Sequence, residues 1–201
     1  MRTGAHPSRR RSLFLVAAGL LAAVLTACTG RGGGQLPPSV GFTGAASFGF
    51  SFSCEDSGGI NPPTGQLRIQ LSYDEHGTSL IGSPFGIHGT ADVIDPVLES
   101  MICIGQNPPP DPPGQNVLTF LGQYRLTSAA PSLFPLSCTG TTTPACRFEV
   151  TVIDNDRNLA PSTGDFFKIS LSSATAPSTT LDGPVFYTRA GTLSAGNLTV
   201  D

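Results

Sequence analysis

The stretch "QLRIQLSY", residues Gln66 to Tyr73, decides the fold class. Apolar side chains occupy every second position and polar side chains fill the positions between them: Leu67, Ile69, Leu71 and Tyr73 alternate with Arg68, Gln70 and Ser72. Successive side chains of a β-strand point to opposite faces of the sheet. This period of two therefore predicts a strand with one buried face and one solvated face.

The same alternation recurs at residues 48–52, 118–126, 148–152, 167–171 and 198–200. Clusters rich in Gly, Pro, Asn, Asp and Ser separate these runs, and no segment sustains the period of a helix. About eight to ten short strands predict an all-β fold, a single antiparallel β-sandwich over residues 44–201. We expect the proline-rich stretch 107–114 to be a stiff loop, because proline has no N–H to donate to a sheet.

The N-terminal segment predicts the compartment. Arg9 to Arg11 precede an uncharged, mostly apolar run, Leu13 to Ala27, which is shorter than the ~20 residues that span a bilayer but typical of a signal peptide. The run ends in "LTA" and Cys28 follows. This resembles the lipobox of bacterial lipoproteins, whose cysteine receives acyl chains such as palmitate. We expect residues 1–27 to be a lipoprotein signal peptide and Cys28 to be lipidated; the alternative is an ordinary secretory signal followed by a chance cysteine.

The segment after the lipobox is rich in glycine and proline. Residues 28–43 include "TGRGGGQLPPSV", which predicts a flexible tether between the lipid and the domain. Loss of residues 1–27 removes four arginines and no acid, so the formal charge changes from −3 to −7. An acidic chain without a basic stripe is unsuited to nucleic acid or to anionic lipid. We expect the Cys28 lipid to hold the protein to the bilayer of a cell membrane or outer membrane, facing the periplasm or the exterior.

The other four cysteines predict disulfide bonds. Cys54, Cys103, Cys138 and Cys146 form an even set in an exported chain, where the surroundings are oxidising. Four cysteines allow three pairings. We favour Cys138–Cys146, which flank a turn-rich stretch, together with Cys54–Cys103. A zinc site is the alternative, but the chain has no Cys-x-x-Cys spacing.

A calcium site is the next candidate. In "DNDRNLAPSTGD", the residues Asp154, Asp156, Asn158 and Asp165 match the ligand positions 1, 3, 5 and 12 of an EF-hand loop. The sixth position, which needs glycine, holds Leu159, and the flanks predict strands rather than helices, so the pattern does not fit an EF-hand. A calcium site of another kind is one alternative. We expect instead a turn between two adjacent antiparallel strands, with no metal, because Asp and Asn bond their own backbone in turns.

Catalytic chemistry has little support in the sequence. His76 lies in the turn-like "YDEHGTS" beside Asp74 and Glu75, and His88 lies in a run that predicts a strand. The Gly-x-Ser-x-Gly turn of α/β-hydrolases does not occur, and a Ser-His-Asp group is recognised by geometry rather than by sequence. We therefore predict no enzyme activity and no catalytic residues.

Several strand motifs resemble an uncharacterised bacterial extracellular β domain, the post-COAP domain family. The matching pieces, in order, are "ASFGF" (46–50), "PTGQL" (63–67), "FEVTVID" (148–154), "GDFFKISLS" (164–172) and "GTLSAGNL" (191–198). The resemblance implies a secreted β domain and names no catalytic residue. We expect a binding or structural role with an unknown protein or glycan partner; the alternative is a small secreted hydrolase or a calcium-modulated binding domain.

Overall fold

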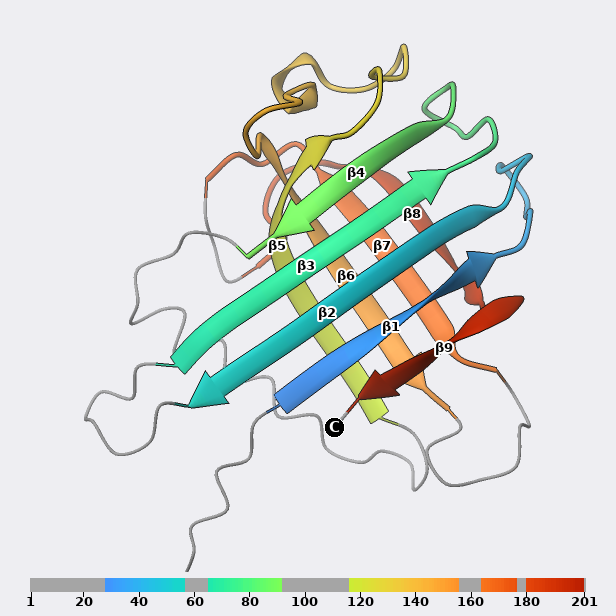
Figure 1. The fold of residues 1–201 in the computed structure, drawn as a ribbon. Helices are drawn as coiled ribbons and strands as arrows, with labels where there is room; N and C mark the ends of the chain where they lie inside the picture. Colours follow the sequence, from blue (N-terminus) through green and yellow to red (C-terminus); the bar gives the residue numbers. More distant parts are fainter. Residues whose placement is uncertain (1–27, 57–64, 92–115, 156–163, 177–179, 201) are drawn as a thin grey trace, which may run out of the picture.

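The computed structural model describes residues 28–56, 65–91, 116–155, 164–176 and 180–200, and nine β-strands account for most of them (Figure 1). The strands are β1 (Cys28–Leu36), β2 (Ala46–Asp56), β3 (Gly65–Glu75), β4 (Phe85–Thr90), β5 (Asn116–Leu126), β6 (Cys146–Asp154), β7 (Phe166–Ser172), β8 (Val185–Thr192) and β9 (Ala195–Val200). A short 3-10 helix, η1 (Leu136–Cys138), lies between β5 and β6. In the described part of the chain, no helix is long and apolar enough to cross a membrane.

The nine strands belong to one antiparallel sheet with the order β8-β7-β6-β5-β4-β3-β2-β1-β9. From β1 to β8 each strand pairs with the next along the chain, whereas β9 pairs with β1 at the other edge. The sheet curls so that β1–β4 and β9 form one layer and β5–β8 cross behind it at a steep angle (Figure 1). The predicted all-β antiparallel class is confirmed, but the strands form one curled sheet rather than the two separate sheets of a sandwich.

The core lies between the two layers of the curled sheet. The four apolar side chains of the Gln66–Tyr73 stretch are buried, and the polar ones between them are exposed, as the alternation predicts. Aromatic rings from the two layers meet in the middle. Phe48 of β2 stacks on Phe167 of β7 with 3.7 Å between ring centroids, and Phe50 approaches Phe120 of β5 at 5.4 Å. These contacts couple strands that are distant in sequence, which makes the curled sheet one packed unit.

The glycine-rich segment predicted as a tether is a strand inside the sheet. β1 pairs with β2 on one side and with β9 on the other, so the prediction of a flexible tether over 28–43 is wrong for Cys28–Leu36. The physical reason is close packing. A Cβ on Gly32 would lie 2.6 Å from the carbonyl oxygen of Asn197, and a Cβ on Gly30 would collide with Leu118. Glycine is needed here because β9 and β5 come too close for a side chain, and the described sheet includes Cys28–Leu36, ahead of the predicted domain start at residue 44.

Four connections lie at one end of the curled antiparallel sheet (Figure 1). One of them, between β7 and β8, carries the exposed Asp182. The other three form what we call the loop end. They are the β1–β2, β3–β4 and β5–β6 connections, residues 37–45, 76–84 and 127–145. The first two are joined by a pair of hydrogen bonds. The backbone N–H of Thr43 donates to the carbonyl of Thr78 (3.0 Å), and the N–H of Thr78 donates to the hydroxyl of Thr43 (2.9 Å). The loop end is therefore a joined surface rather than a set of independent loops.

Candidate functional site

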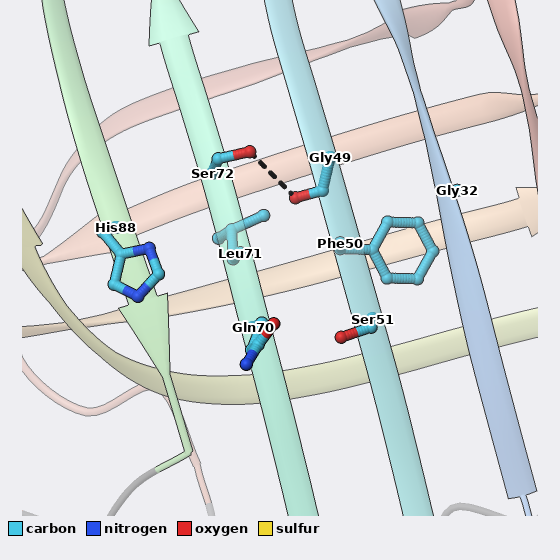
Figure 2. Close-up of a pocket in the computed structure, with 8 residues that line it drawn as sticks. All are labelled: Gly32, Gly49, Phe50, Ser51, Gln70, Leu71, Ser72 and His88. Atoms are coloured by element: carbon cyan, nitrogen blue, oxygen red, sulfur yellow. Dashed lines mark hydrogen bonds between the residues drawn. The ribbon is translucent and has the colours of Figure 1, made fainter.

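A shallow hollow lies on the outer face of the layer that contains β1–β4 (Figure 2). It has a volume of about 400 Å³ and opens broadly to solvent. Four polar side chains surround it: Ser51 on β2, Gln70 and Ser72 on β3, and His88 on β4. Parts of Gly32, Gly49, Phe50 and Leu71 complete its lining.

The strand register explains why these polar groups meet. Ser72 lies directly opposite Gly49 on one side and opposite His88 on the other, and Ser51 lies opposite Gln70. Residues that face each other across an antiparallel pair project from the same side of the sheet. Because the alternate residues on these strands are buried in the core, the polar set points outward.

Gly49 creates the space at the centre of the hollow. A Cβ there would lie 3.3 Å from the Ser72 hydroxyl oxygen, with no closer contact, so a side chain would fit but would occupy the hollow. The Ser72 hydroxyl reaches across to the Gly49 carbonyl at 3.4 Å, which orients it over the centre (Figure 2). The backbone at Gly49 does not require glycine through a positive φ. This residue therefore contributes to the shape of the surface more than to the fold.

The hollow offers hydrogen bonds without formal charge. Its side chains provide two hydroxyls, one amide and one imidazole, each able to donate or accept, and among the described residues no carboxylate, lysine or arginine lines it. The register places Arg125 of β5 next to His88, but the Arg125 guanidinium donates to the carbonyl of Thr141 (3.1 Å). The arrangement suits a neutral polar ligand.

The predicted cysteine sites are partly resolved. Cys138 and Cys146 are joined by a disulfide bond with an S–S distance of 1.99 Å, which confirms that predicted pair. Cys103 lies outside the described residues, so the Cys54–Cys103 bond stays a prediction. The β1–β2 register places Cys28, the predicted lipidation site, directly opposite Cys54.

Two of the four candidate calcium ligands bind the backbone of β9. The carboxylate of Asp165 accepts hydrogen bonds from the backbone N–H of Leu198 (2.7 Å) and of Asn155 (3.1 Å), and the carboxylate of Asp154 accepts one from the N–H of Val200 (3.1 Å). The other two candidates, Asp156 and Asn158, lie outside the described residues. Among the residues that the structure describes, no group of three His, Cys, Asp or Glu side chains could hold a metal ion.

The prediction that this segment joins two adjacent antiparallel strands is confirmed. β6 ends at Asp154, β7 begins at Phe166, and the two strands pair along their length. β9 lies at the edge of the sheet, where backbone N–H groups on its outer side would otherwise lack partners. The two carboxylates provide those partners. Their role at this edge is structural, and the calcium-like spacing in the sequence did not indicate it.

The two histidines lie in different surroundings. His88 borders the hollow, whereas the imidazole Nε2 of exposed His76 is 2.8 Å from the hydroxyl of Ser47. Asp74 faces Ser47 in the ladder between β2 and β3. Among the described residues, however, no carboxylate is hydrogen-bonded to the His76 ring. A serine and a histidine are thus brought together, without the third group of a catalytic triad.

A buried polar cluster was not predicted from the sequence. Glu75 and Arg189 are both buried, and their side chains form an ion pair with 2.7 Å between Oε2 and Nη1. The hydroxyls of Tyr73 and Tyr187 also contact Glu75 Oε2, at 3.1 and 2.8 Å, and contact each other. One feature of the sequence could have indicated this cluster. Asp74 and Glu75 are adjacent at the end of β3, so they point to opposite faces and one of the two must face the core.

Arg189 ties the cluster to the loop end. Its second terminal nitrogen donates to the carbonyls of Pro37 (2.8 Å) and Gly44 (3.0 Å), which are the two sides of the β1–β2 connection. The guanidinium also lies 4.3 Å above the ring of Phe42, in a cation–π contact. The cluster therefore fastens a loop to the core, which is a structural function.

Burial changes the chemistry of the cluster's tyrosines. Desolvation raises the pKa of Tyr73 well above its usual range, and the neighbouring Glu75 charge adds to the rise. Burial raises the pKa of Tyr187 in the same direction, helped by Tyr73. The hydroxyls therefore keep their protons and act as hydrogen-bond donors to the carboxylate.

No protein-family model, curated protein or solved structure matches this chain. The resemblance to the post-COAP family, made on strand motifs, stays a prediction.

Proposed function

We propose that this protein is a lipid-anchored lipoprotein of the bacterial cell envelope whose β domain binds a neutral, hydroxyl-rich glycan and catalyses no reaction. The observation that carries the binding role is the hollow at Gly49, where four uncharged hydrogen-bonding side chains surround a space left by a missing side chain. Sugar hydroxyls both donate and accept hydrogen bonds, and so do the serine hydroxyls and the Gln70 amide.

The expected affinity follows from the shape of the hollow. It is shallow, and the ring of Phe50 belongs to the core rather than to the outer face. Without an aromatic ring on which a sugar could stack, hydrogen bonds alone hold the ligand, and each contributes little in water. We expect a dissociation constant of roughly 0.1 to 1 mM for a single glycan unit. The apparent affinity should be higher when several anchored molecules bind the same glycan polymer.

Binding is tested with soluble fragments of bacterial cell-wall glycans by isothermal titration calorimetry. Gly49→Val fills the hollow with a side chain that a strand tolerates, so the affinity should fall at least tenfold while the melting temperature is kept. His88→Ala should weaken binding by a smaller factor. Thr188→Ala, an exposed change on β8 away from the hollow, is the matched control. Equal affinity of the Gly49→Val variant and the parent would refute the site.

The anchor is supported by the lipobox-like "LTAC" and by the position of Cys28 at the start of β1. Because β1 begins at that residue, acyl chains on Cys28 would hold the sheet against the bilayer without a tether. Substitution Cys28→Ser should move the protein from the membrane fraction to the soluble fraction of the producing cells. A variant that stays in the membrane fraction would contradict the lipoprotein assignment.

Peptide mapping under non-reducing conditions gives an independent test of the cysteines. If Cys28 carries acyl chains, Cys54 should be found linked to Cys103, and Cys28 should appear in an acylated peptide. The register makes a different outcome informative, because Cys28 and Cys54 are facing residues. A Cys28–Cys54 linked peptide would contradict both the anchor and the predicted Cys54–Cys103 bond.

Hydrolysis is the second candidate function, and the 2.8 Å contact between Ser47 and His76 is the observation that favours it. The contact lies on an exposed part of the surface, so it offers little exclusion of water. A serine-reactive fluorophosphonate probe tests it directly. Labelling of the parent that is lost in both Ser47→Ala and His76→Ala would establish a nucleophilic serine and replace the non-enzymatic proposal.

A further inference from the structure

The loop end carries exposed aliphatic side chains and almost no charge. Residues 37–45, 76–84 and 127–145 contain no Lys, Arg, Asp or Glu, and His76 is their one titratable side chain apart from the disulfide-bonded Cys138. Four of the large hydrophobic residues that are exposed in the described part of the chain lie on these three connections. They are Val40, Leu80, Leu133 and Leu136. Isolated exposed aliphatic residues are ordinary on protein surfaces, but their clustering on an uncharged end is not.

The β5–β6 connection is built to hold its leucines outward. Phe134 is 5% exposed and packs against Phe85 and Phe186, with ring centroids 5.7 and 5.0 Å away. Its neighbours in sequence behave differently, since Leu133 is 68% and Leu136 is 91% exposed. The buried Cys138–Cys146 disulfide closes the same connection. The buried Phe134 and the disulfide hold the connection against the core, and Leu133 and Leu136 point to solvent from it.

The three connections support one another, so their tips keep their relative positions. The N–H of Leu133 donates to the carbonyl of Ile81 (3.2 Å), which joins the β5–β6 connection to the β3–β4 connection. A Cβ on Gly41 would lie 3.4 Å from Leu80 Cγ, so the turn that carries Val40 packs against the turn that carries Leu80. The two turns are closed by backbone bridges between Ser39 and Phe42 and between Ser79 and Gly82.

We propose that the loop end inserts its aliphatic tips into the surface of a zwitterionic phospholipid bilayer. Charge is the first reason. A charged side chain is costly to bring into the low-dielectric interface, and these connections have none of their own. Arg125 and Arg189 donate to backbone carbonyls of the connections, but both belong to strands, and Arg189 is buried and paired with Glu75. Anionic headgroups would therefore gain little from the aliphatic tips. The second reason is shape, because the aliphatic side chains occupy the tips of separate turns rather than the walls of a groove.

A protein partner fits this surface less well. The residues that dominate protein interfaces are Trp, Tyr and Arg in packed pockets, and none occurs in the three connections. A second copy of the chain would have to pack convex tips against convex tips, which buries little area compared with the roughly 800 Å² per partner of a stable interface. A fluid bilayer adapts to separate protruding tips and needs only apolar area to bind them.

The insertion is separate from the proposed acyl anchor. Cys28 begins β1 and the Val40 turn follows the other end of that strand, whose nine residues span about 26 Å. An anchored molecule therefore presents its tips away from the membrane that holds its acyl chains. Such a molecule would bind a second lipid surface and draw two bilayers together.

Flotation with phosphatidylcholine vesicles tests the insertion without the anchor. The protein is residues 28–201 with Cys28→Ser, which contains every described strand. We expect it to float with the vesicles, equally in low salt and in 1 M salt and without enhancement by anionic lipid, since no basic residue takes part. Leu133→Ser with Leu136→Ser should lower the partition coefficient at least tenfold. Leu133→Met with Leu136→Met, which keeps the apolar surface, should bind as the parent does.

A tryptophan probe locates the contact. The chain has no tryptophan, so Leu136→Trp introduces a single reporter at the loop end, and Lys168→Trp introduces one on β7 as the control. Vesicles should shift the emission of the first to shorter wavelength and leave the second unchanged. Vesicle clustering by the acylated parent, lost in the serine double variant, would show that both ends bind lipid.

The outcomes separate the two proposals. Flotation of the Cys28→Ser protein supports the insertion whether or not Cys28 is acylated in cells, and membrane retention of the acylated serine double variant supports the anchor whether or not the tips insert. Absence of flotation, or flotation that the serine double variant retains, overturns the insertion. Concentration-dependent dimerisation that the serine double variant abolishes, without flotation, would assign the tips to a second copy of the chain instead.

Discussion

Two buried carboxylates of this protein are stabilised in different ways. Glu75, at the end of β3, is 1% exposed and faces the guanidinium of Arg189 and two tyrosine hydroxyls. Asp165, just before β7, is 5% exposed and accepts hydrogen bonds from two backbone N–H groups. One charge is balanced by an opposite charge, and the other is held by peptide dipoles.

The difference teaches what each site depends on. The Glu75 cluster brings together side chains separated by 112 and 114 positions in the chain, so it forms only when the curled sheet closes. The Asp165 carboxylate binds backbone groups, so it needs the β9 strand in place but no particular side chain there. Removing one partner should therefore be more damaging at Glu75, where a buried charge would be left unpaired.

The largest effect is expected for Arg189→Met, which keeps the bulk of the side chain and removes its charge. Glu75 would then be a buried carboxylate without a cation, and the β1–β2 connection would lose two hydrogen bonds. We expect the free energy of unfolding to fall by about 3 to 5 kcal/mol, measured by urea denaturation. The double variant Glu75→Leu with Arg189→Met is the control and should recover much of the loss. Equal stability of the single and double variants would contradict a paired charge.

Alkaline pH should destabilise the fold through the tyrosines of the Glu75 cluster. The folded-state pKa of Tyr73 and of Tyr187 is raised by burial, so the stability that they contribute is complete below their unfolded pKa of ~10 and decreases as the pH rises above it. Two tyrosines that ionise only on unfolding should cost about 3 kcal/mol for each pH unit above 10. Tyrosinate absorbance should appear together with loss of β-sheet circular dichroism. Ionisation of all tyrosines in the folded protein would contradict their burial.

A smaller effect is expected for Asp165→Asn. The amide offers one acceptor oxygen where the carboxylate offers two, so one of the N–H groups of Asn155 and Leu198 loses its partner. The free energy of unfolding should fall by about 1 to 3 kcal/mol. Hydrogen exchange measured by NMR should become faster at Leu198 or Asn155 before it changes in the core strands. Lys168→Gln on the neighbouring strand is the control. Unchanged exchange at both amides would refute the role of Asp165 at the sheet edge.

The smallest effect is expected for calcium. Because Asp154 and Asp165 already bind backbone N–H groups of the β9 edge, we expect the melting temperature to be the same in excess calcium and in excess chelator. A ligand at 100 times its dissociation constant would add about 2.7 kcal/mol and raise the melting temperature by several degrees. A rise of that size that Asp156→Ala abolishes would establish the calcium-modulated alternative.

The strands with a period of two were predictable because burial of one face leaves a mark on every second residue. Leu67, Ile69 and Leu71 show it in β3, and Phe48 and Phe50 show it in β2. β1 leaves no such mark. Its inward positions are occupied by glycines such as Gly30 and Gly32. Leu118 of the other layer fills the space that a side chain on Gly30 would take, and the neighbouring strand β9 fills the space at Gly32. A strand that needs glycine for close packing has the same composition as a flexible linker, so composition alone could not distinguish the two.

The candidate site was predictable only in part. The alternation of β2 and β3 already assigns Ser51, Gln70 and Ser72 to the outer face, but nothing local shows that Gly49 lies opposite Ser72 or that β4 places His88 beside them. Register between strands depends on which turns close and which faces meet in the core. For the same reason the Ser47–His76 contact and the clustering of aliphatic tips at the loop end appear only in the folded chain.

The sequence by itself determined the all-β class, most of the strands and the adjacency of β6 and β7, and it favoured the Cys138–Cys146 pair, because each depends on neighbours in the chain. Only the tertiary structure decided that the strands form one curled sheet, that β1 lies inside it, and that Arg189 pairs with Glu75. These features depend on residues brought together across more than a hundred positions. Local patterns record whether a side chain is buried, but they do not record what it is buried against.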